Sequence, residues 1–349
     1  MFVRDAWYTA AWGDEVSENP LGRRICNEPI VFFRDQRGKV AALEDRCCHR
    51  GLPLHLGTVV EQGLQCGYHG LVYDRTGRCV YIPAQDQIPE RAKVRSYPVQ
   101  ERDQLVWVWI GDPSKADETK PPDFAYHNDT ANWPHKHAVL HINANYVLLL
   151  DNLMDATHVG YVHSKTIGGD PLAFVRAKEK LTRNPNGLTL TSWLLDSTPP
   201  PTYVKGVGFE GKIDRWLERQ YIAPGSVLLW TGAVNAGMGA YENNRREGGF
   251  SLRMFNGLTP ETETTSFYFW SAANSYRQNE PQATEQLFAE VESTFAEDKS
   301  VIEAQQKRLT EFGDAGRVDI TTDRTQLAMR RIIERMLAGS AAGVTLDVA

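Results

Sequence analysis

Two short segments of the chain each place a cysteine close to a histidine. Cys47 and His49 are separated by one residue, and sixteen residues further on Cys66 and His69 are separated by two. The chain has five cysteines, four of them within 33 residues, and this odd number at low density does not suggest a secreted disulfide scaffold. Two thiols and two imidazoles at such close spacing predict a metal centre instead.

The order of these four residues separates two kinds of metal centre. A Rieske [2Fe–2S] cluster needs two thiolates on one iron and two imidazoles on the other, and two loops that each supply one cysteine and one histidine meet that need. Zinc sites of the Cys₂His₂ type usually group their ligands, with two cysteines followed by two histidines. Each pair is mixed here, so the sequence favours the cluster, and a zinc site is the alternative.

A second group of candidate ligands lies in residues 151–163, where His158 and His163 are five residues apart. Non-haem iron oxygenases bind Fe(II) through two histidines and one carboxylate, which leaves positions for O₂. Residues 145–161 have helical spacing, but five residues rotate a helix by about 500°, so both histidines cannot share a face of one straight helix. We therefore expect the helix to end or bend between them, with Gly160 as the break.

Asn152 and Asp155 precede His158 at intervals of three residues, which places all three near one face of the predicted helix. A carboxylate beside a ligand imidazole orients the ring and fixes its tautomer. Asn152 and Asp155 are therefore predicted to assist the reaction from beside the iron.

These patterns resemble a known family. Residues 47–51 and 66–71 resemble the C-P-H-R and C-x-Y-H-G loops of Rieske non-haem iron oxygenases, and residues 151–163 resemble their D-N-x-x-D-x-x-H-x-x-x-x-H motif. Cys48 and Gly67 stand where proline is common, but neither is a ligand position. The resemblance covers nearly the whole chain and is closest to the vanillate O-demethylase, toluenesulfonate methyl-monooxygenase and dicamba demethylase group.

The resemblance implies the metal ligands. The cluster ligands would be Cys47, His49, Cys66 and His69, and two iron ligands would be His158 and His163. The third iron ligand must be a carboxylate from elsewhere in the chain. Residues 297–303 resemble the family's E-D-x-x-x-x-E helix, which points to Asp298, with Glu297 and Glu303 as the competing carboxylates.

The resemblance also implies a homotrimer. In the family, the residue at the Asp155 position links an iron-binding histidine of one subunit to a cluster-binding histidine of its neighbour. Asp155 would then connect His158 to His69 of the partner subunit and carry electrons between the two centres.

Composition divides the chain into two predicted domains of an α+β protein. Residues 1–115 contain strand and hairpin patterns and are expected to form an all-β Rieske domain. Residues 111–123 are polar and rich in proline, and we interpret them as the boundary. Residues 124–349 mix strands with long helical patterns, and this catalytic domain is expected to contain an antiparallel sheet flanked by helices.

The expected reaction is oxidation by O₂ of a small aromatic acid at a methoxy or methyl group, as the resemblance implies. The second domain is rich in aromatic residues, and some are expected to line an apolar pocket, with Trp230 as a candidate substrate contact. The resemblance to dicamba-type enzymes implies Asn256 as a second candidate. Two alternatives are a ring-hydroxylating dioxygenase of the phthalate type on the same scaffold and a Rieske electron carrier without catalytic activity.

Several partners can be excluded or inferred. The net charge is −6 and the pI about 5.9, which argues against nucleic acid as a partner. No apolar run reaches the length of a membrane span, so a cytoplasmic protein is expected. Residues 206–211 match G-x-G-x-x-G but lack the surrounding pattern of a dinucleotide site. Electrons from NAD(P)H are therefore expected to arrive through a separate reductase, with or without a ferredoxin.

Overall fold

The computed structural model describes residues 1–342 except residues 165, 169, 171 and 315. The chain forms two compact units. The first comprises Met1–Asp123 together with Thr259–Glu263, and the second comprises residues 124–258 and the chain from residue 264 onward. The polar segment 111–123 belongs to the first unit, where Pro113–Glu118 form a 3₁₀ turn capped by the Asp112 side chain.

The first unit is all-β apart from short 3₁₀ turns, as predicted. It has three antiparallel sheets, with strand orders β1-β11-β10, β2-β3-β4-β9 and β5-β6-β7-β8. The strands are β1 (Ala6–Trp12), β2 (Leu21–Ile25), β3 (Glu28–Arg34), β4 (Val40–Glu44), β5 (Thr58–Val60), β6 (Gly63–Gln65), β7 (Val72–Tyr73), β8 (Cys79–Tyr81), β9 (Ser96–Tyr97), β10 (Val99–Arg102) and β11 (Leu105–Ile110). Every residue of β11 is buried, which explains its unbroken apolar sequence.

The second unit contains a seven-stranded antiparallel sheet in the order β12-β18-β17-β16-β15-β14-β13. Its strands are β12 (His135–Ile142), β13 (Lys178–Asn184), β14 (Gly187–Ser197), β15 (Ile213–Ile222), β16 (Ser226–Asn235), β17 (Phe250–Pro260) and β18 (Ser266–Asn274). The helices are α1 (Tyr146–Met154), α2 (Val159–Val162), α3 (Pro201–Val207), α4 (Pro281–Phe312) and α5 (Arg324–Ala342). This arrangement confirms the predicted α+β fold.

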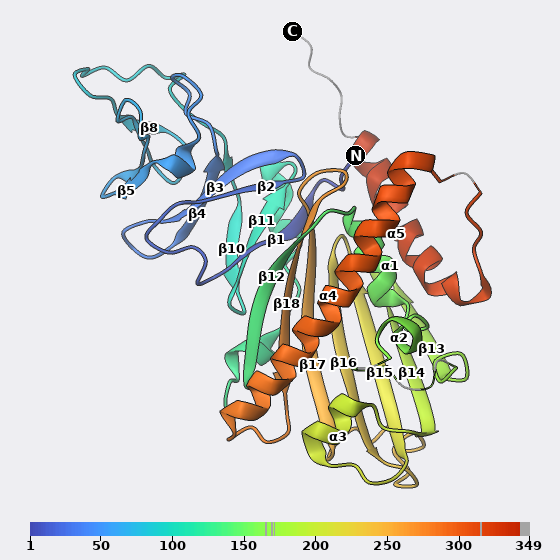
Figure 1. The fold of residues 1–349 in the computed structure, drawn as a ribbon. Coiled ribbons are helices and arrows are strands. Elements are labelled where there is room, and N and C mark those ends of the chain that lie inside the picture. The colour runs from blue at the N-terminus through green and yellow to red at the C-terminus, as the bar shows by residue number, and fades with distance from the viewer. Residues whose placement is uncertain (165, 169, 171, 315, 343–349) are drawn as a thin grey trace. The chain divides into compact units, whose positions relative to one another are not determined.

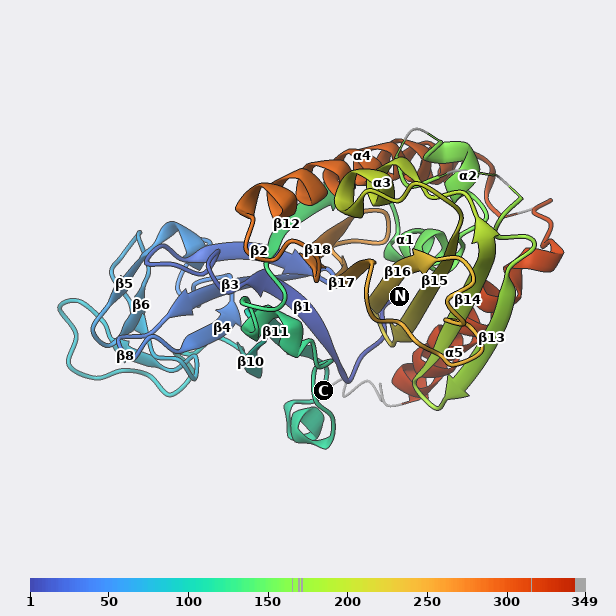
Figure 2. The same ribbon diagram turned by 90° about the horizontal axis from the view of Figure 1, so that it is seen from below.

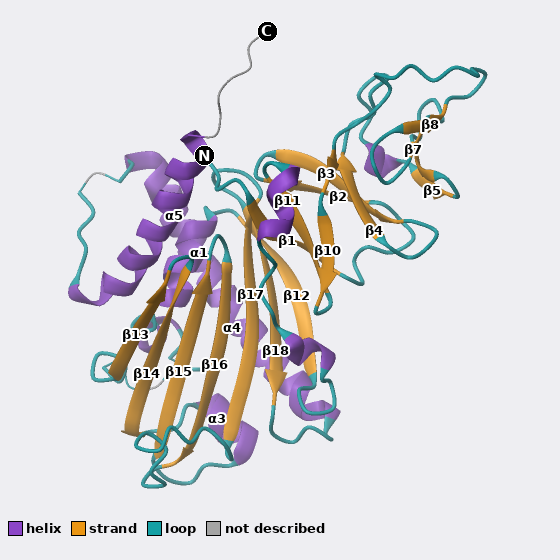
Figure 3. Ribbon diagram, turned by 180° about the vertical axis from the view of Figure 1, so that it is seen from behind, coloured by secondary structure: helices purple, strands orange, loops and turns teal. Residues whose placement is uncertain are grey.

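Helices α1 to α4 lie on one face of this sheet, and α4 crosses it diagonally (Figures 1 and 2). The opposite face is seen from behind without a helix across its centre (Figure 3). Because strand residues alternate between faces, every second side chain of β15 and β16 points toward the helices. No helix among the described residues is long and apolar enough to cross a membrane.

The helix predicted over residues 145–161 is in fact two helices, and the predicted break at Gly160 was wrong. Helix α1 ends at Met154, and Gly160 lies inside α2. The break falls at Asp155, whose Oδ1 accepts hydrogen bonds from the backbone N–H and the hydroxyl of Thr157, both at 2.7 Å. Such a local turn competes with helix formation. His158 therefore precedes α2 and His163 follows it.

Candidate metal centres

The first centre is built from two loops with the same hydrogen-bonding pattern. In one loop, the Cys47 N–H donates to the Leu52 carbonyl and its carbonyl accepts from Gly51. In the other, Cys66 N–H donates to the carbonyl of Leu71, and the Cys66 carbonyl accepts from Gly70. Both glycines have a positive φ, 76° for Gly51 and 73° for Gly70, which a residue with a Cβ rarely adopts. The two loops thus have the same backbone arrangement around Cys47 and Cys66.

The two cysteines of this centre are buried, and its two histidines are exposed. Cys47 and Cys66 are buried in the apolar core of this unit, whereas His49 and His69 are exposed. The two imidazole rings have their centroids 4.5 Å apart, so the loops bring the histidines together. Two buried thiols with two adjacent imidazoles are the donor set that a Rieske cluster requires.

Tyr73 is a residue of this centre that sequence analysis missed. Its fully buried hydroxyl accepts a hydrogen bond from the Cys48 N–H at 3.2 Å and lies 3.1 Å from the sulfur atoms of Cys47 and Cys48. Burial raises the pKa of Tyr73 well above its usual value, so the hydroxyl keeps the proton that it can donate to sulfur. A tyrosine in a strand gives no sequence signal for such a role.

Replacing Tyr73 with phenylalanine is expected to lower the reduction potential of a cluster bound here by about 60 mV. A hydrogen bond to sulfur stabilises the more negative reduced form, and about 1.4 kcal/mol corresponds to 59 mV for one electron. A redox titration followed by EPR would measure the shift. Tyr81→Phe is the control, because Tyr81 is an exposed tyrosine on β8. An unchanged potential in Tyr73→Phe would show that the hydroxyl does not act on the cluster.

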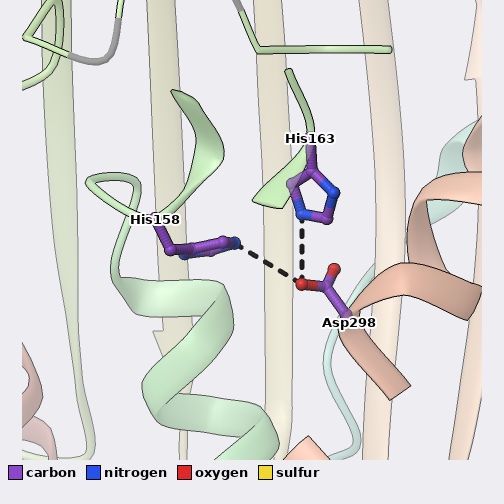
Figure 4. A group of neighbouring side chains, drawn as sticks. All are labelled: His158, His163 and Asp298. Atoms are coloured by element: carbon purple, nitrogen blue, oxygen red, sulfur yellow. Dashed lines mark ion pairs between the residues drawn. The ribbon is translucent and has the colours of Figure 1, made fainter. Parts of the chain in front are cut away.

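The second centre joins His158, His163 and Asp298, which offer ligand atoms within 4.8 Å of one another (Figure 4). Oδ1 of Asp298 lies 3.1 Å from Nε2 of His163 and 3.5 Å from Nε2 of His158. Such separations suit a shared first-row metal ion, whose bonds to nitrogen and oxygen are about 2.0–2.2 Å long. The two histidines flank the short helix α2, and Asp298 reaches them from α4.

The neighbouring polar residues hold these three side chains in place. Asn152 donates from Nδ2 to Oδ1 of Asp298 at 2.9 Å, and the same Nδ2 is 3.5 Å from Nε2 of His158. Nδ1 of His163 lies 2.7 Å from Oε2 of Glu297. Consecutive residues of α4 therefore contact the two nitrogens of one ring.

Two other carboxylates have different positions. Glu303 accepts hydrogen bonds from the backbone and side chain of Asn143 at 2.9 and 3.1 Å, so it does not join the group. Oδ2 of Asp155 lies 4.0 Å from Nδ1 of His158, on the side of the ring away from Asp298. Asp155 therefore stands where it can orient the His158 ring.

Burial and charge act differently on the two histidines. Burial lowers the pKa of His158, which favours the neutral ring that a metal ion requires. Burial also opposes protonation of His163, but the carboxylates of Asp298 and Glu297 outweigh it and raise the pKa of that ring. A cation bound at Nε2 would take the place of the proton there and would offset the charge of Asp298, so the ring would bind it in the neutral form.

A cavity opens from the second centre toward the sheet. The empty space within it is about 810 Å³, a figure that includes open solvent at its mouth. Most of its lining is apolar, and the polar exceptions include the three candidate ligands, Asn152, Asn256, Arg215 and Arg219. The candidate ligands therefore lie in a mostly apolar cavity with a few polar groups, which is the usual surrounding of a small-molecule site.

Of the two candidate substrate contacts, Asn256 lines the cavity and Trp230 does not. Asn256 lines the cavity, although its amide already donates to the Val227 carbonyl and accepts from the Tyr268 hydroxyl. Trp230 is absent from the lining of this cavity among the described residues. Its neighbours Leu229 and Thr231 face the cavity, so strand alternation places Trp230 on the opposite face, where Arg253 lies over its ring. Aromatic composition could not distinguish the two faces.

The fold and these two centres define a class of protein: a Rieske-type domain joined to a catalytic domain with a His–His–Asp site in an apolar cavity. Comparisons with known proteins identify the same two domains. Residues 6–98 match the Rieske [2Fe-2S] domain, and residues 142–339 match the vanillate O-demethylase oxygenase C-terminal domain.

Individual relatives cover nearly the whole length of the chain. The iron-sulfur subunit of the toluene-4-sulfonate monooxygenase system of Comamonas testosteroni is 39% identical, covering 98% of this chain and 99% of the relative. The vanillate O-demethylase oxygenase subunit of a Pseudomonas species is 35% identical, covering 97% and 96%. The crystal structure of dicamba monooxygenase bound to dicamba superimposes with a TM-score of 0.89 at 34% identity, covering 98% and 99%.

The chain therefore belongs to the vanillate O-demethylase family of Rieske oxygenases. It is the terminal oxygenase component of a multicomponent monooxygenase system. This membership decides against a simple electron carrier, because the second domain is an oxygenase domain rather than an accessory one.

Proposed function

We propose that His158, His163 and Asp298 bind a mononuclear Fe(II), and that Cys47, His49, Cys66 and His69 hold the Rieske cluster. The observation that carries the first assignment is the convergence of three ligand atoms within 4.8 Å at the end of an apolar cavity. Two histidines and one carboxylate match the facial triad of non-haem iron oxygenases. Bound there, the iron would activate O₂, with electrons supplied through the cluster.

The protein residues around this site position ligands and exclude water. Glu297 accepts from Nδ1 of His163, which leaves the Nε2 lone pair of that ring free for a metal. Asn152 donates to Asp298 and fixes the direction of its carboxylate. The apolar walls formed by side chains such as Leu217, Leu229 and Phe295 keep bulk water away from the reacting carbon.

The proposed substrate is a small aromatic acid with a methyl or methoxy substituent. Hydroxylation of a methoxy carbon gives a hemiacetal, which collapses to a phenol and formaldehyde, and hydroxylation of a methyl group gives a benzylic alcohol. One oxygen atom of O₂ enters the product, and the other leaves as water after two electrons and two protons are supplied. A separate reductase, with or without a ferredoxin, would deliver those electrons from NAD(P)H.

Product analysis tests this proposal. The purified protein would be incubated with a matched reductase, NADH and a panel of methyl- and methoxy-substituted aromatic acids, while O₂ uptake and formaldehyde are measured. Substrate-dependent O₂ uptake with stoichiometric formaldehyde or benzylic alcohol is expected. A cis-dihydrodiol would instead establish the ring-hydroxylating alternative, and no substrate-dependent O₂ uptake would contradict the assignment.

We also propose that the protein forms a homotrimer in which Asp155 connects His158 to His69 of the partner subunit. The position of Asp155 beside the His158 ring, at 4.0 Å, supports a bridging role. The exposure of His69 supports it from the other side, because a surface imidazole can reach a neighbouring chain.

The variant Asp155→Asn is expected to lower turnover about 100-fold while both metal centres stay loaded. The amide keeps the size of the side chain but loses the charge that pairs with an imidazole, and losses of 10–100-fold are typical for such supporting residues. Stopped-flow reoxidation of the reduced cluster would show whether transfer is the slowed step. Asp170→Asn is the control, since this exposed carboxylate lies outside both centres. Normal cluster reoxidation in Asp155→Asn would refute the bridge.

A further inference from the structure

The cavity contains a buried cation that the proposed iron chemistry does not use. Arg215 lies on β15, its residue is 5% exposed, and it lines the same cavity as His158, His163 and Asp298. Its guanidinium carbon lies 5.4 Å from the centroid of the Phe174 ring and 4.8 Å from that of Tyr203. The guanidinium is thus held against two aromatic rings.

The Arg215 side chain has no hydrogen bond and no ion pair with any residue that the structure describes, and its buried Nε has no acceptor. A guanidinium carries five N–H donors, and aromatic faces do not accept them as oxygen atoms do. The hydroxyls of Tyr203 and Thr231 bond to each other at 2.6 Å, and Thr231 also donates to the Trp216 carbonyl. Neither hydroxyl oxygen accepts a hydrogen bond from the Arg215 side chain in the described part of the chain.

The second arginine that lines the cavity, Arg219, differs from Arg215 because it has a structural role. Arg219 follows Arg215 by four residues on the same face of β15. It donates to the Met154 carbonyl and to the Ser192 hydroxyl, both at 3.0 Å. It also lies 4.0 Å from a carboxylate oxygen of Glu179. Arg219 therefore connects α1 to the sheet and β15 to its neighbour β14 through polar contacts, whereas the Arg215 side chain contacts aromatic rings and makes no polar contact within the described chain.

A buried and unpaired guanidinium is costly unless an anion arrives to pair with it. The described residues supply no carboxylate to Arg215, and the carboxylate of the adjacent Asp214 accepts from the Asp196 and Gly237 backbone N–H groups instead. Two parallel N–H bonds to a carboxylate or sulfonate are the pairing that a guanidinium makes best.

We propose that Arg215 binds the anionic group of the aromatic acid and thereby orients the ring in the cavity, with the opposite end of the substrate toward His158, His163 and Asp298. Arg215 would select acids over neutral aromatics of the same shape. This inference rests on the proposed function only in taking the occupant of the cavity to be an aromatic acid.

Calorimetric titration without reductase tests the inference, because binding is then measured in the absence of turnover. The probes are toluene-4-sulfonate and 3-methoxybenzoate, each compared with its neutral amide, toluene-4-sulfonamide and 3-methoxybenzamide. The wild-type protein is expected to bind at least one anion about 100-fold more tightly than its amide. Arg215→Met should lose that preference and bind both members of each pair within about threefold of the wild-type affinity for the amide.

Two further variants control for folding and for charge. Arg215→Lys keeps the charge without the paired donors and should retain part of the preference, about 10-fold. Arg253→Met is the matched control, because Arg253 is also held over aromatic rings but lies outside this cavity. It should bind the probes as the wild type does.

The inference would be overturned if the wild type bound neither anion at millimolar concentration, if it bound anions and amides equally, or if Arg215→Met kept the preference. Failure of the proposed function would look different. In that case anion binding would still depend on Arg215, but the protein would hold no mononuclear iron and consume no O₂ with any acid of the panel.

Discussion

The variant Asp298→Ala is expected to lose the mononuclear iron and at least about 1,000-fold of its turnover, while the Rieske cluster stays in place. Among the described residues, Asp298 supplies the carboxylate oxygen that lies near both histidines, and Asn152 holds it there. Two imidazoles alone bind Fe(II) weakly, and a loss of about 4 kcal/mol corresponds to 1,000-fold. Iron analysis, a Rieske EPR spectrum and O₂ uptake would be measured on the same preparation.

Two variants on the same helix make this experiment specific. Glu303→Ala removes a carboxylate that contacts Asn143 rather than the histidines, so it should keep both its iron and most of its activity. Glu297→Gln should retain iron with an affinity lowered 10–100-fold, because it only supports His163. If Asp298→Ala retained one iron per chain beyond the two of the cluster and Glu303→Ala did not, the ligand assignment would be wrong.

The variant His69→Ala is expected to lose the Rieske cluster and to retain the mononuclear iron, the reverse of Asp298→Ala. Its reductase-driven turnover should also fall more than about 1,000-fold. His69 is exposed, so its removal leaves the packing of the first unit intact, unlike removal of the buried Cys66. A [2Fe–2S] cluster that loses one of four ligands is not held by three. Visible absorption, EPR and iron content would be compared with the wild type.

The neighbouring residues Arg50 and His55 provide controls for this variant. Arg50→Gln changes an exposed side chain in the same motif. His55→Gln changes a histidine that pairs with Asp45 instead of joining His49 and His69. Both should retain the cluster spectrum. A normal Rieske signal in His69→Ala would exclude His69 as a ligand.

Much of this protein could be predicted from the sequence, because its chemistry is encoded over short distances. The pairs Cys47–His49 and Cys66–His69 each lie within one loop, so spacing alone restricts their geometry. The α+β fold followed from strand and helix patterns together with the family resemblance. Asp298 could be placed with His158 and His163 only through that resemblance, because it lies 135 positions after His163 and no local pattern joins them.

Other features depend on tertiary structure and left no pattern to follow. Gly160 was a poor guide to the helix break, because the Asp155 turn ends α1 first. Whether Trp230 or its neighbours face the cavity depends on which side of the sheet α4 covers, and composition does not contain that information. The position of the Tyr73 hydroxyl beside two cysteine sulfur atoms, and the burial of the Arg215 side chain without a polar partner in the described chain, arise only from the tertiary structure.

The contacts of His163 have a consequence for how the protein acquires its metal. Glu297 and Asp298, adjacent in α4, occupy both nitrogens of one ring, and that ring is 1% exposed. Rotation of the ring by half a turn would break both contacts at once, so Nε2, the nitrogen proposed to bind the ion, already points toward Asp298 before any ion arrives. We therefore expect iron to be stripped by a chelator and returned repeatedly without refolding, since loading needs only local adjustment of an existing site.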